Sequence, residues 1–480
     1  MVDDNDSPRL PFQGSVEETT AMLPSVLALS PLQPLIFDVL VQIMGLLDSR
    51  PDVLSFMKTS KAFYQAGFPC LLRLPISLYL WQRSNNGHLE SFLAYLQKYP
   101  SRLQYIENFS AMMGGLGYQM IAQYYSNLFV AIMGVIKLVV RNAGSLRKLS
   151  FNGFGRHVDQ EHSSVYPVSV VEVYPAQFTL NHLRDLFITR IGIDEIIMLK
   201  GLTAPITSLM LIYADIFKAT PDPHESELNP FLLLTNFQST IEKLELTGCR
   251  WPGPNQQASP AHQGSSSFFS PPSYGICCPR LHTLTTSYET TPNTSSFVLT
   301  FPNLKRLTVL DDKEIFEGDY SGRETNTENQ RALLRQGFGW DVLEKVTGHP
   351  KLLNALALQT KIHHLRVEYC YAQDLVLLHR LIQDTKPDIL TLVLVDFQST
   401  DPFRLDTHPR NLRIASPPYQ LESLLLDVVE ENDSLTSEEA SEIAERTIRI
   451  LGGRITRARC SNFRIDANFN FSSLRPYIVL

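Results

Sequence analysis

Four side chains within one short stretch have the donor types of a metal site. They are His363, His364, Cys370 and His379. Zinc sites use such ligands, but in spaced pairs that their spacing here does not match. His363 and His364 are adjacent, and both fall at polar positions of a predicted strand. We therefore interpret these histidines as structural and expect no metal site.

Catalytic and nucleotide-binding motifs are missing as well. The glycine clusters Gly114-Gly115-Leu116-Gly117 and Gly337-Phe338-Gly339 lack the third glycine of a G-x-G-x-x-G motif. They also lack the strand-to-helix setting of a nucleotide-binding loop. No G-x-S-x-G, H-E-x-x-H or P-loop sequence occurs. Serine, histidine and aspartate are abundant, so only a non-local triad stays open. We expect a protein that is not an enzyme and has no cofactor.

The composition narrows the class of protein further. The chain has 480 residues, an apolar fraction of 44%, a charged fraction of 19% and a net charge of −7. A negative net charge argues against nucleic-acid binding. The acidic N-terminus does not resemble a signal peptide, and the longest apolar run, from 128 to 140, is too short for a membrane span. The six scattered cysteines favour reduced thiols, so we expect a cytoplasmic or nuclear protein without membrane contact.

Two predicted helices form an N-terminal domain at residues 29–72, after a disordered acidic tail at 1–28. In the first helix, apolar residues recur every three or four positions, at Leu35, Val39, Ile43, Leu46 and Leu47. Ser49 and Asp52 form a capping-box pattern before the second helix, and Gly67 followed by Pro69 ends it. The apolar side of the second helix comprises Val53, Leu54, Met57 and Phe63.

The remaining chain, 73–480, contains a recurring strand pattern. An aliphatic residue at position n is followed by two polar residues and by further apolar residues at n+3 and n+5. The ten candidate repeats begin at Leu146, Leu183, Ile206, Ile241, Leu281, Leu304, Ile362, Ile389, Leu421 and Ile455. Because side chains alternate along a strand, n+3 and n+5 point into the core, and n+4 and n+6 point outward.

Long intervals between the repeats leave room for helices and loops. We expect helices at 373–384 and 436–453, and loop insertions at about 251–280 and 311–330. The fold class is therefore α/β: a helical hairpin followed by an irregular solenoid, with a parallel sheet on one side and helices on the other.

The repeat region resembles a leucine-rich-repeat domain of the irregular, helix-containing kind. In that family a cysteine or asparagine often closes the strand at n+8, where this chain has Cys249 and Cys370. Other repeats have Phe154, Asp312, Phe397 or Phe463 there. The resemblance implies a horseshoe that binds other proteins.

The N-terminal domain resembles an F-box of the divergent form that precedes leucine-rich repeats in many fungal proteins. The similarity covers residues 34–35, 39–47, 52–54 and 60–63. Two departures are a Pro34-Leu35 start where the family has Leu-Pro, and Phe63 where tryptophan is usual.

The F-box resemblance implies docking to a Skp-family adaptor and, through it, to a cullin-RING ligase. The protein would then be the substrate-recognition subunit of an SCF-type E3 ubiquitin ligase. The residues expected to bind the adaptor are Pro34, Leu35, Val39, Ile43, Leu47, Leu54 and Phe63. Two alternatives stay open: these residues only cap the repeats, or the protein is a repeat scaffold with no ligase role.

Outward positions of the repeat strands are the candidates for binding a target protein. They include Phe187, Met210, Ile212, Arg366 and Val395. Exposed apolar and arginine side chains among charges are typical of a protein interface. The alternative is that loops or the C-terminal tail cover them.

Overall fold

The computed structural model contains two compact units, one up to Cys70 and one from Leu71 onward. It describes residues 32–80, 86–113, 134–136, 138–152, 178–191, 193–213, 230–249, 251, 276–288, 292–310, 322–370, 374–395, 420–429, 454–455 and 458–460. The expected tail at 1–28, the expected helix at 436–453 and most of the two expected insertions lie outside these residues.

The first unit contains three helices where the sequence predicted two. They are α1 (Leu32–Gly45), α2 (Arg50–Met57) and α3 (Lys61–Arg73), the last of which extends three residues past the boundary. The predicted second helix breaks because the side chain of Ser60 accepts a hydrogen bond from the Phe63 amide at 3.1 Å and so starts a new helix. Ser49, by contrast, makes no side-chain cap of α2.

The prediction that Gly67 and Pro69 end the helix was also wrong, because α3 continues to Arg73. Gly67 serves close packing instead. A Cβ atom at this position would lie 2.2 Å from Cγ of Met57 and 3.1 Å from Sδ of Met44. Met44, Met57 and Val53 are buried and form the core of the unit. A glycine is therefore required where α3 approaches that core.

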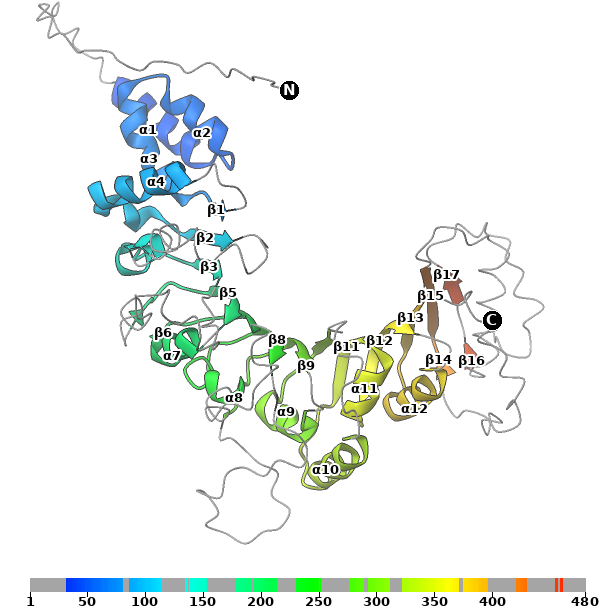
Figure 1. Cartoon of the computed structure of the whole chain (residues 1–480). Coiled ribbons are helices and arrows are strands. Elements are labelled where there is room, and N and C mark those ends of the chain that lie inside the picture. Colours follow the sequence, from blue (N-terminus) through cyan, green and yellow to red (C-terminus); the bar gives the residue numbers. More distant parts are fainter. Residues whose placement is uncertain are drawn as a thin grey trace, which may run out of the picture. The chain divides into compact units, whose positions relative to one another are not determined.

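The second unit is built on one 13-stranded sheet (Figure 1). Every neighbouring pair of strands in it is parallel. The strands, in their order in the sheet, are β1 (Ile76–Leu80), β2 (Asn108–Met113), β3 (Lys148–Asn152), β5 (Asp185–Ile191), β7 (Ser208–Tyr213), β8 (Lys243–Cys249), β9 (Thr283–Tyr288), β10 (Arg306–Val309), β11 (Val342–Gly348), β12 (Lys361–Cys370), β13 (Ile389–Val395), β15 (Ser423–Val429) and β17 (Ala458–Cys460). Sheet order follows chain order, as it does in a solenoid of the leucine-rich-repeat type.

Short paired strands and helices complete the second unit. The paired strands are β4 (Phe178–Thr179) with β6 (Leu202–Thr203), and β14 (Gln420–Leu421) with β16 (Arg454–Ile455). The helices are α4 (Asn86–Lys98), η2 (Pro100–Tyr105), α7 (Ile193–Gly201), α8 (Pro230–Leu233), α9 (Thr294–Thr300), α10 (Arg323–Arg335), α11 (Pro350–Leu356) and α12 (Leu375–Thr385). Helices α7 to α12 lie on one side of the sheet (Figure 1). We call the opposite side the strand surface.

The predicted repeat register holds for nine of the ten candidate repeats. Leu149, Leu186 and Leu209, each at n+3, lie side by side in neighbouring strands, and the n+3 row continues through β8, β9 and β10. The inward n+3 and n+5 side chains of these strands are buried in one continuous core. The expected helix at 373–384 is confirmed as α12.

The repeat from Ile389 and three missed strands of the main sheet need correction. Leu390, not Leu392, pairs with Leu365, so the register proposed from Ile389 is two residues late. Strands β1, β2 and β11 were not predicted. β11 escapes the pattern because Gly348 occupies its n+5 slot, where a Cβ atom would lie 2.8 Å from the carbonyl oxygen of Val309.

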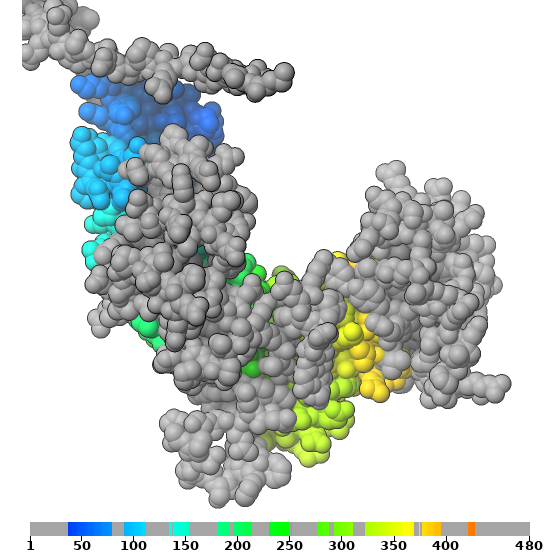
Figure 2. Space-filling view, viewed as in Figure 1, coloured from blue at the N-terminus to red at the C-terminus, as the bar shows by residue number. Residues whose placement is uncertain are grey.

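Helix α10 begins inside the expected insertion at 311–330 and buries polar side chains. Asn326 accepts from the Thr294 amide at 3.0 Å and donates to the carbonyls of Pro292 and Ala355 at 3.0 and 3.1 Å. Gln330 donates to the carbonyls of Leu356 and Ala357, both at 2.9 Å. These amides satisfy carbonyls at the C-terminal end of α11 that have no partner within that helix. The outer side of α10 is at the molecular surface (Figure 2, light green).

Candidate functional site

The first candidate surface is an apolar stripe on α1. Val39 and Ile43 on α1 and Leu46, the first residue after the helix, follow one another at helical spacing, and 45%, 44% and 79% of their surfaces are exposed. The opposite side of the helix carries Met44, which is fully buried, and the half-buried Phe37. Apolar residues thus surround α1, but the core of the unit uses only one side.

The other predicted adaptor-binding residues differ in exposure. Leu54 on α2 is 40% exposed, whereas Leu47 is half-buried. Phe63 is half-buried too. Its ring stacks on that of Phe37, with the ring centroids 5.0 Å apart, and packs edge to face with that of Phe56, with the centroids 5.3 Å apart. Pro34 and Leu35 lie within α1, but their side chains are outside the described part. The exposed set therefore comprises Val39, Ile43, Leu46 and Leu54, and we call it the apolar stripe.

The second candidate is the strand surface, where three of the five predicted target-binding residues come together. Phe187 on β5 lies beside Met210 on β7, and Ile212 follows two positions further along β7. All three side chains are half-buried, whereas the alternating Leu186, Leu209 and Leu211 are in the core. We call Phe187, Met210 and Ile212 the apolar cluster.

The other two predicted residues lie elsewhere on the sheet. Arg366 is on β12, five strands from β7 in the sheet order, and its Nε lies 3.1 Å from a carboxylate oxygen of Glu368. Val395 ends β13 beside Val429, and its side chain is outside the described residues. The five predicted residues therefore lie at two separate places along the sheet.

Sequence reasoning missed the residues that precede Arg366 on the strand surface. Arg306 on β10 lies beside Lys345 on β11, and Lys345 lies beside His364 on β12. We call Arg306, Lys345, His364 and Arg366 the basic ladder. Its central member escaped notice because β11 was not predicted. The signal was present in the sequence as the polar n+2 position of each repeat, although that position was interpreted only as evidence for strands.

Charges around the basic ladder are partly balanced. A carboxylate oxygen of Glu344 lies 3.5 Å from Nε of Arg306, and the other lies 3.1 Å from Nζ of Lys305. The pKa of His364 is lowered because the ring is partly buried and because Lys345, His363 and Arg366 are close. The ladder therefore has an excess of positive charge.

Strand β8 lies between the apolar cluster and the basic ladder and carries two outward charges, the exposed ammonium of Lys243 and, two positions further on, the carboxylate of Glu245. Glu245 lies between Met210 on β7 and Thr285 on β9. Partial burial raises its pKa, and within the described residues it forms no ion pair. The strand surface therefore changes from apolar, through one lysine and one acid on β8, to basic.

The residues first considered for metal binding have other partners. His363 Nδ1 lies 3.0 Å from Asp388, and His364 Nε2 lies 2.9 Å from the hydroxyl of Thr391. His379 Nε2 lies 2.9 Å from the side-chain amide of Gln383 on α12. Within the part of the chain that the structure describes, no three His, Cys, Asp or Glu side chains are grouped to hold a metal ion.

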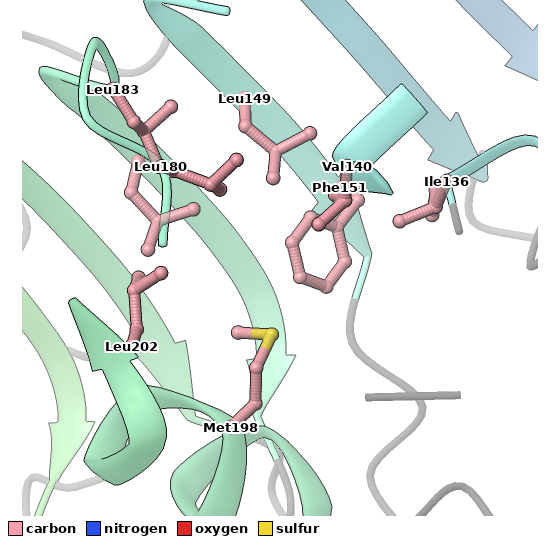
Figure 3. A pocket seen from close by; sticks show the side chains of 9 residues that line it. Ile136, Val140, Leu149, Phe151, Leu180, Leu183, Met198 and Leu202 are labelled. Atoms are coloured by element: carbon pink, nitrogen blue, oxygen red, sulfur yellow. The ribbon is translucent and has the colours of Figure 1, made fainter. Parts of the chain in front are cut away.

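A cavity in the second unit is a packing gap rather than a ligand site (Figure 3). Its volume is about 10 Å³, and every residue around it is apolar: Ile136, Val140, Leu149, Phe151, Leu180, Leu183, Leu186, Met198 and Leu202. Such a space is about the size that one water molecule needs, and it offers a water no polar partner.

Cys249, which fills the n+8 slot of its repeat, is buried at the end of β8. Its Sγ lies 3.7 Å from the carbonyl oxygen of Ser287 and 3.9 Å from the hydroxyl of Thr286. These contacts link β8 to β9, as the family resemblance implied for this position. They are contacts within the protein and give Cys249 a structural role.

Comparison with known proteins adds no further identification: no protein-family model and no curated protein matches this chain. Among the described residues, no helix has the length and apolar character needed to cross a bilayer. What the structure establishes is an α/β fold whose long parallel sheet and interspersed helices are consistent with a leucine-rich-repeat solenoid.

Proposed function

We propose that this protein is the substrate-recognition subunit of an SCF-type E3 ubiquitin ligase and is not itself an enzyme. The first unit docks to a Skp-family adaptor, which links it to a cullin-RING ligase. The strand surface of the second unit holds the target protein. The exposure of Val39 and Ile43 on α1, and of Leu46 directly after its end, is the single observation that supports this proposal most strongly.

The physical argument concerns the cost of leaving such side chains in water. Fully burying a large aliphatic side chain is worth about 1.5–3 kcal/mol. A small helical unit that leaves several of them exposed at helical spacing gains substantially when a partner helix covers them. Interfaces usually draw most of their affinity from a few such central residues. The apolar stripe has the composition of an interface of this kind.

The alternative is a repeat scaffold with no ligase role. It shares the target-binding strand surface with the ligase proposal but assigns no partner to the apolar stripe. Phe63 is neutral between the two, because its contacts with Phe37 and Phe56 hold the helices of the first unit together in either case. Binding of a Skp-family adaptor therefore distinguishes the two functions.

The test is co-purification of the full chain with a Skp-family adaptor. We expect the wild type to retain the adaptor, and Ile43→Asp combined with Leu54→Asp to lose it, because a partner would have to desolvate two carboxylates. Ile197→Asp is the matched control, since Ile197 on α7 is 45% exposed, as Ile43 is 44%. The control should bind like the wild type. No binding by the wild type, or undiminished binding by the double variant, contradicts the proposal.

A further inference from the structure

The basic ladder lacks enough nearby acid to balance it. Arg306, Lys345 and Arg366 of the ladder and the neighbouring Lys305 carry four positive charges, and the carboxylates paired with them are Glu344 and Glu368. Lys345 is exposed and has no ion pair among the described contacts. An excess of exposed positive charge attracts acidic groups and repels basic ones.

The apolar cluster lies on the same face of the same sheet. The sheet order places β8, β9 and β10 between β7, which carries Met210 and Ile212, and β11, which carries Lys345. Four steps of about 4.8 Å separate β7 from β11, which is about 19 Å. An extended polypeptide that crosses the strands advances about 3.3 Å per residue, so it spans this distance in about six residues.

We propose that the strand surface binds one extended segment of a partner polypeptide, with an apolar side chain on the cluster of Phe187, Met210 and Ile212 and acidic side chains about six residues away on the basic ladder. This inference rests on the target-binding role of the repeats and adds the chemistry of the segment that they recognise.

Glu245 sets the register of that segment. It lies one strand beyond Met210, so it faces the first or second residue after the apolar anchor. An acidic residue at that point would meet a partly buried carboxylate, and like charges there cost binding energy. The segment therefore places its acids late, over β10 to β12, and carries a neutral or basic residue beside its anchor.

The test uses a displayed library of random 12-residue peptides, selected on the immobilised full chain. We expect enriched sequences to carry an aliphatic or aromatic residue and, about six positions away, two or more acidic residues. Selection on Arg306→Glu combined with Lys345→Glu should lose the acidic preference while the apolar one remains. Phe187→Ser combined with Met210→Ser should lose the apolar preference while the acidic one remains.

Affinity for one enriched synthetic peptide gives the size of the effect. We expect the double charge reversal to weaken it about tenfold or more, and Arg331→Glu, an exposed control on α10, to change it less than twofold. Equal enrichment on wild-type and charge-reversed protein, acids beside the anchor, or no enrichment at all would overturn the inference. Adaptor binding by the same variants is measured separately, so a failure here is distinguishable from a failure of the ligase role.

Discussion

Helices α1 and α10 reverse the usual relation between polarity and burial, in opposite directions. α10 turns Asn326 and Gln330 into the protein, where every hydrogen-bonding group of their amides has a backbone partner, while Leu334 near its end is 46% exposed. α1 leaves Val39 and Ile43 in solvent. The two cases have different explanations. The polar side chains of α10 form hydrogen bonds with backbone groups of neighbouring segments, whereas the exposed apolar side chains of α1 are only partly covered by the protein.

The neighbours of α10 are the carbonyls at the end of α11. Arg323 donates to the carbonyl of Asn354 at 2.8 Å, and Asn326 and Gln330 donate to the next three carbonyls. The carbonyls of Asn354, Leu356 and Ala357 also accept from the Ala357 amide, the Thr294 hydroxyl and the Gln359 side chain. Without the donors on α10, the carbonyl of Ala355 would be buried as an unpaired acceptor and the other three would each lose a donor. A buried polar side is thus stabilising inside the second unit. An exposed apolar side on α1 has no such role within its own unit and is available for a partner.

The largest expected effect breaks the polar side of α10. Asn326→Leu keeps a side chain of similar size but leaves the Thr294 amide and the carbonyls of Pro292 and Ala355 without their partner. Because each unpaired buried group costs about 1–3 kcal/mol, we expect a loss of about 3 kcal/mol or more in the free energy of unfolding. Glu328→Leu, at an exposed position of the same helix, is the control and should change it by less than about 0.5 kcal/mol.

Urea unfolding followed by tryptophan fluorescence measures this difference. Trp81, Trp251 and Trp340 are the three tryptophans of the chain, and all lie in the second unit. Equal stability of the Asn326 and Glu328 variants would show that the amide network contributes nothing beyond side-chain volume.

A smaller effect, dependent on pH, tests a second buried polar group in the same region. His349 is 2% exposed, and its Nδ1 accepts the Lys351 amide at the start of α11. Burial, with a contribution from Lys351, lowers its pKa from 6.5 to about 4. Between these values the unfolded chain binds a proton that the folded chain excludes, so stability falls as the pH drops from about 6.5 towards 4.

Replacing His349 by asparagine separates the cap from the titration. Asparagine is a good helix cap but does not titrate. Between pH 7.5 and 4.5 we expect the wild type to lose about 2–3 kcal/mol more than His349→Asn does, as measured by urea unfolding at both values. Parallel pH profiles of the two proteins would mean that the ring is protonated in the folded state without penalty.

The contrast also explains what the sequence could predict. Strand positions such as Leu149, Leu186 and Leu209 were found because burial in a repeat selects aliphatic residues at a fixed spacing. α10 was mistaken for part of a loop insertion because its buried side is made of amides, which a hydrophobic period cannot detect. The register of β13 was misread because Ile389 offers an aliphatic residue at n, whereas the n position of the true register is Pro387. The pairing of Leu390 with Leu365 gives the true register.

The candidate sites show the same limit. The adjacency of Phe187 and Met210 follows from the repeat register and was within reach. The basic ladder could not be predicted in the same way. Lys345 belongs to β11, and this strand does not match the repeat pattern because Gly348 occupies its n+5 position. For α1, the spacing of apolar residues identified Val39 and Ile43 as one side of the helix. Spacing alone does not distinguish a side that packs in the core of the unit from a side that binds a partner.

The smallest expected effect, that of Ile43→Asn, belongs to the sharpest test of the comparison, which uses two adjacent residues of one helix. Met44 is fully buried beside Gly67 and Met57, whereas Ile43 is 44% exposed. Met44→Asn buries an unpaired amide and removes core packing, so we expect it to destabilise the first unit by about 2–5 kcal/mol. Ile43→Asn should change its stability by less than about 0.5 kcal/mol.

Hydrogen–deuterium exchange of peptides from residues 32–73 of the full chain reports on this unit alone. If Ile43→Asn accelerates exchange as much as Met44→Asn does, the stripe is part of the core of the unit; slow exchange together with lost adaptor binding would assign it to a partner.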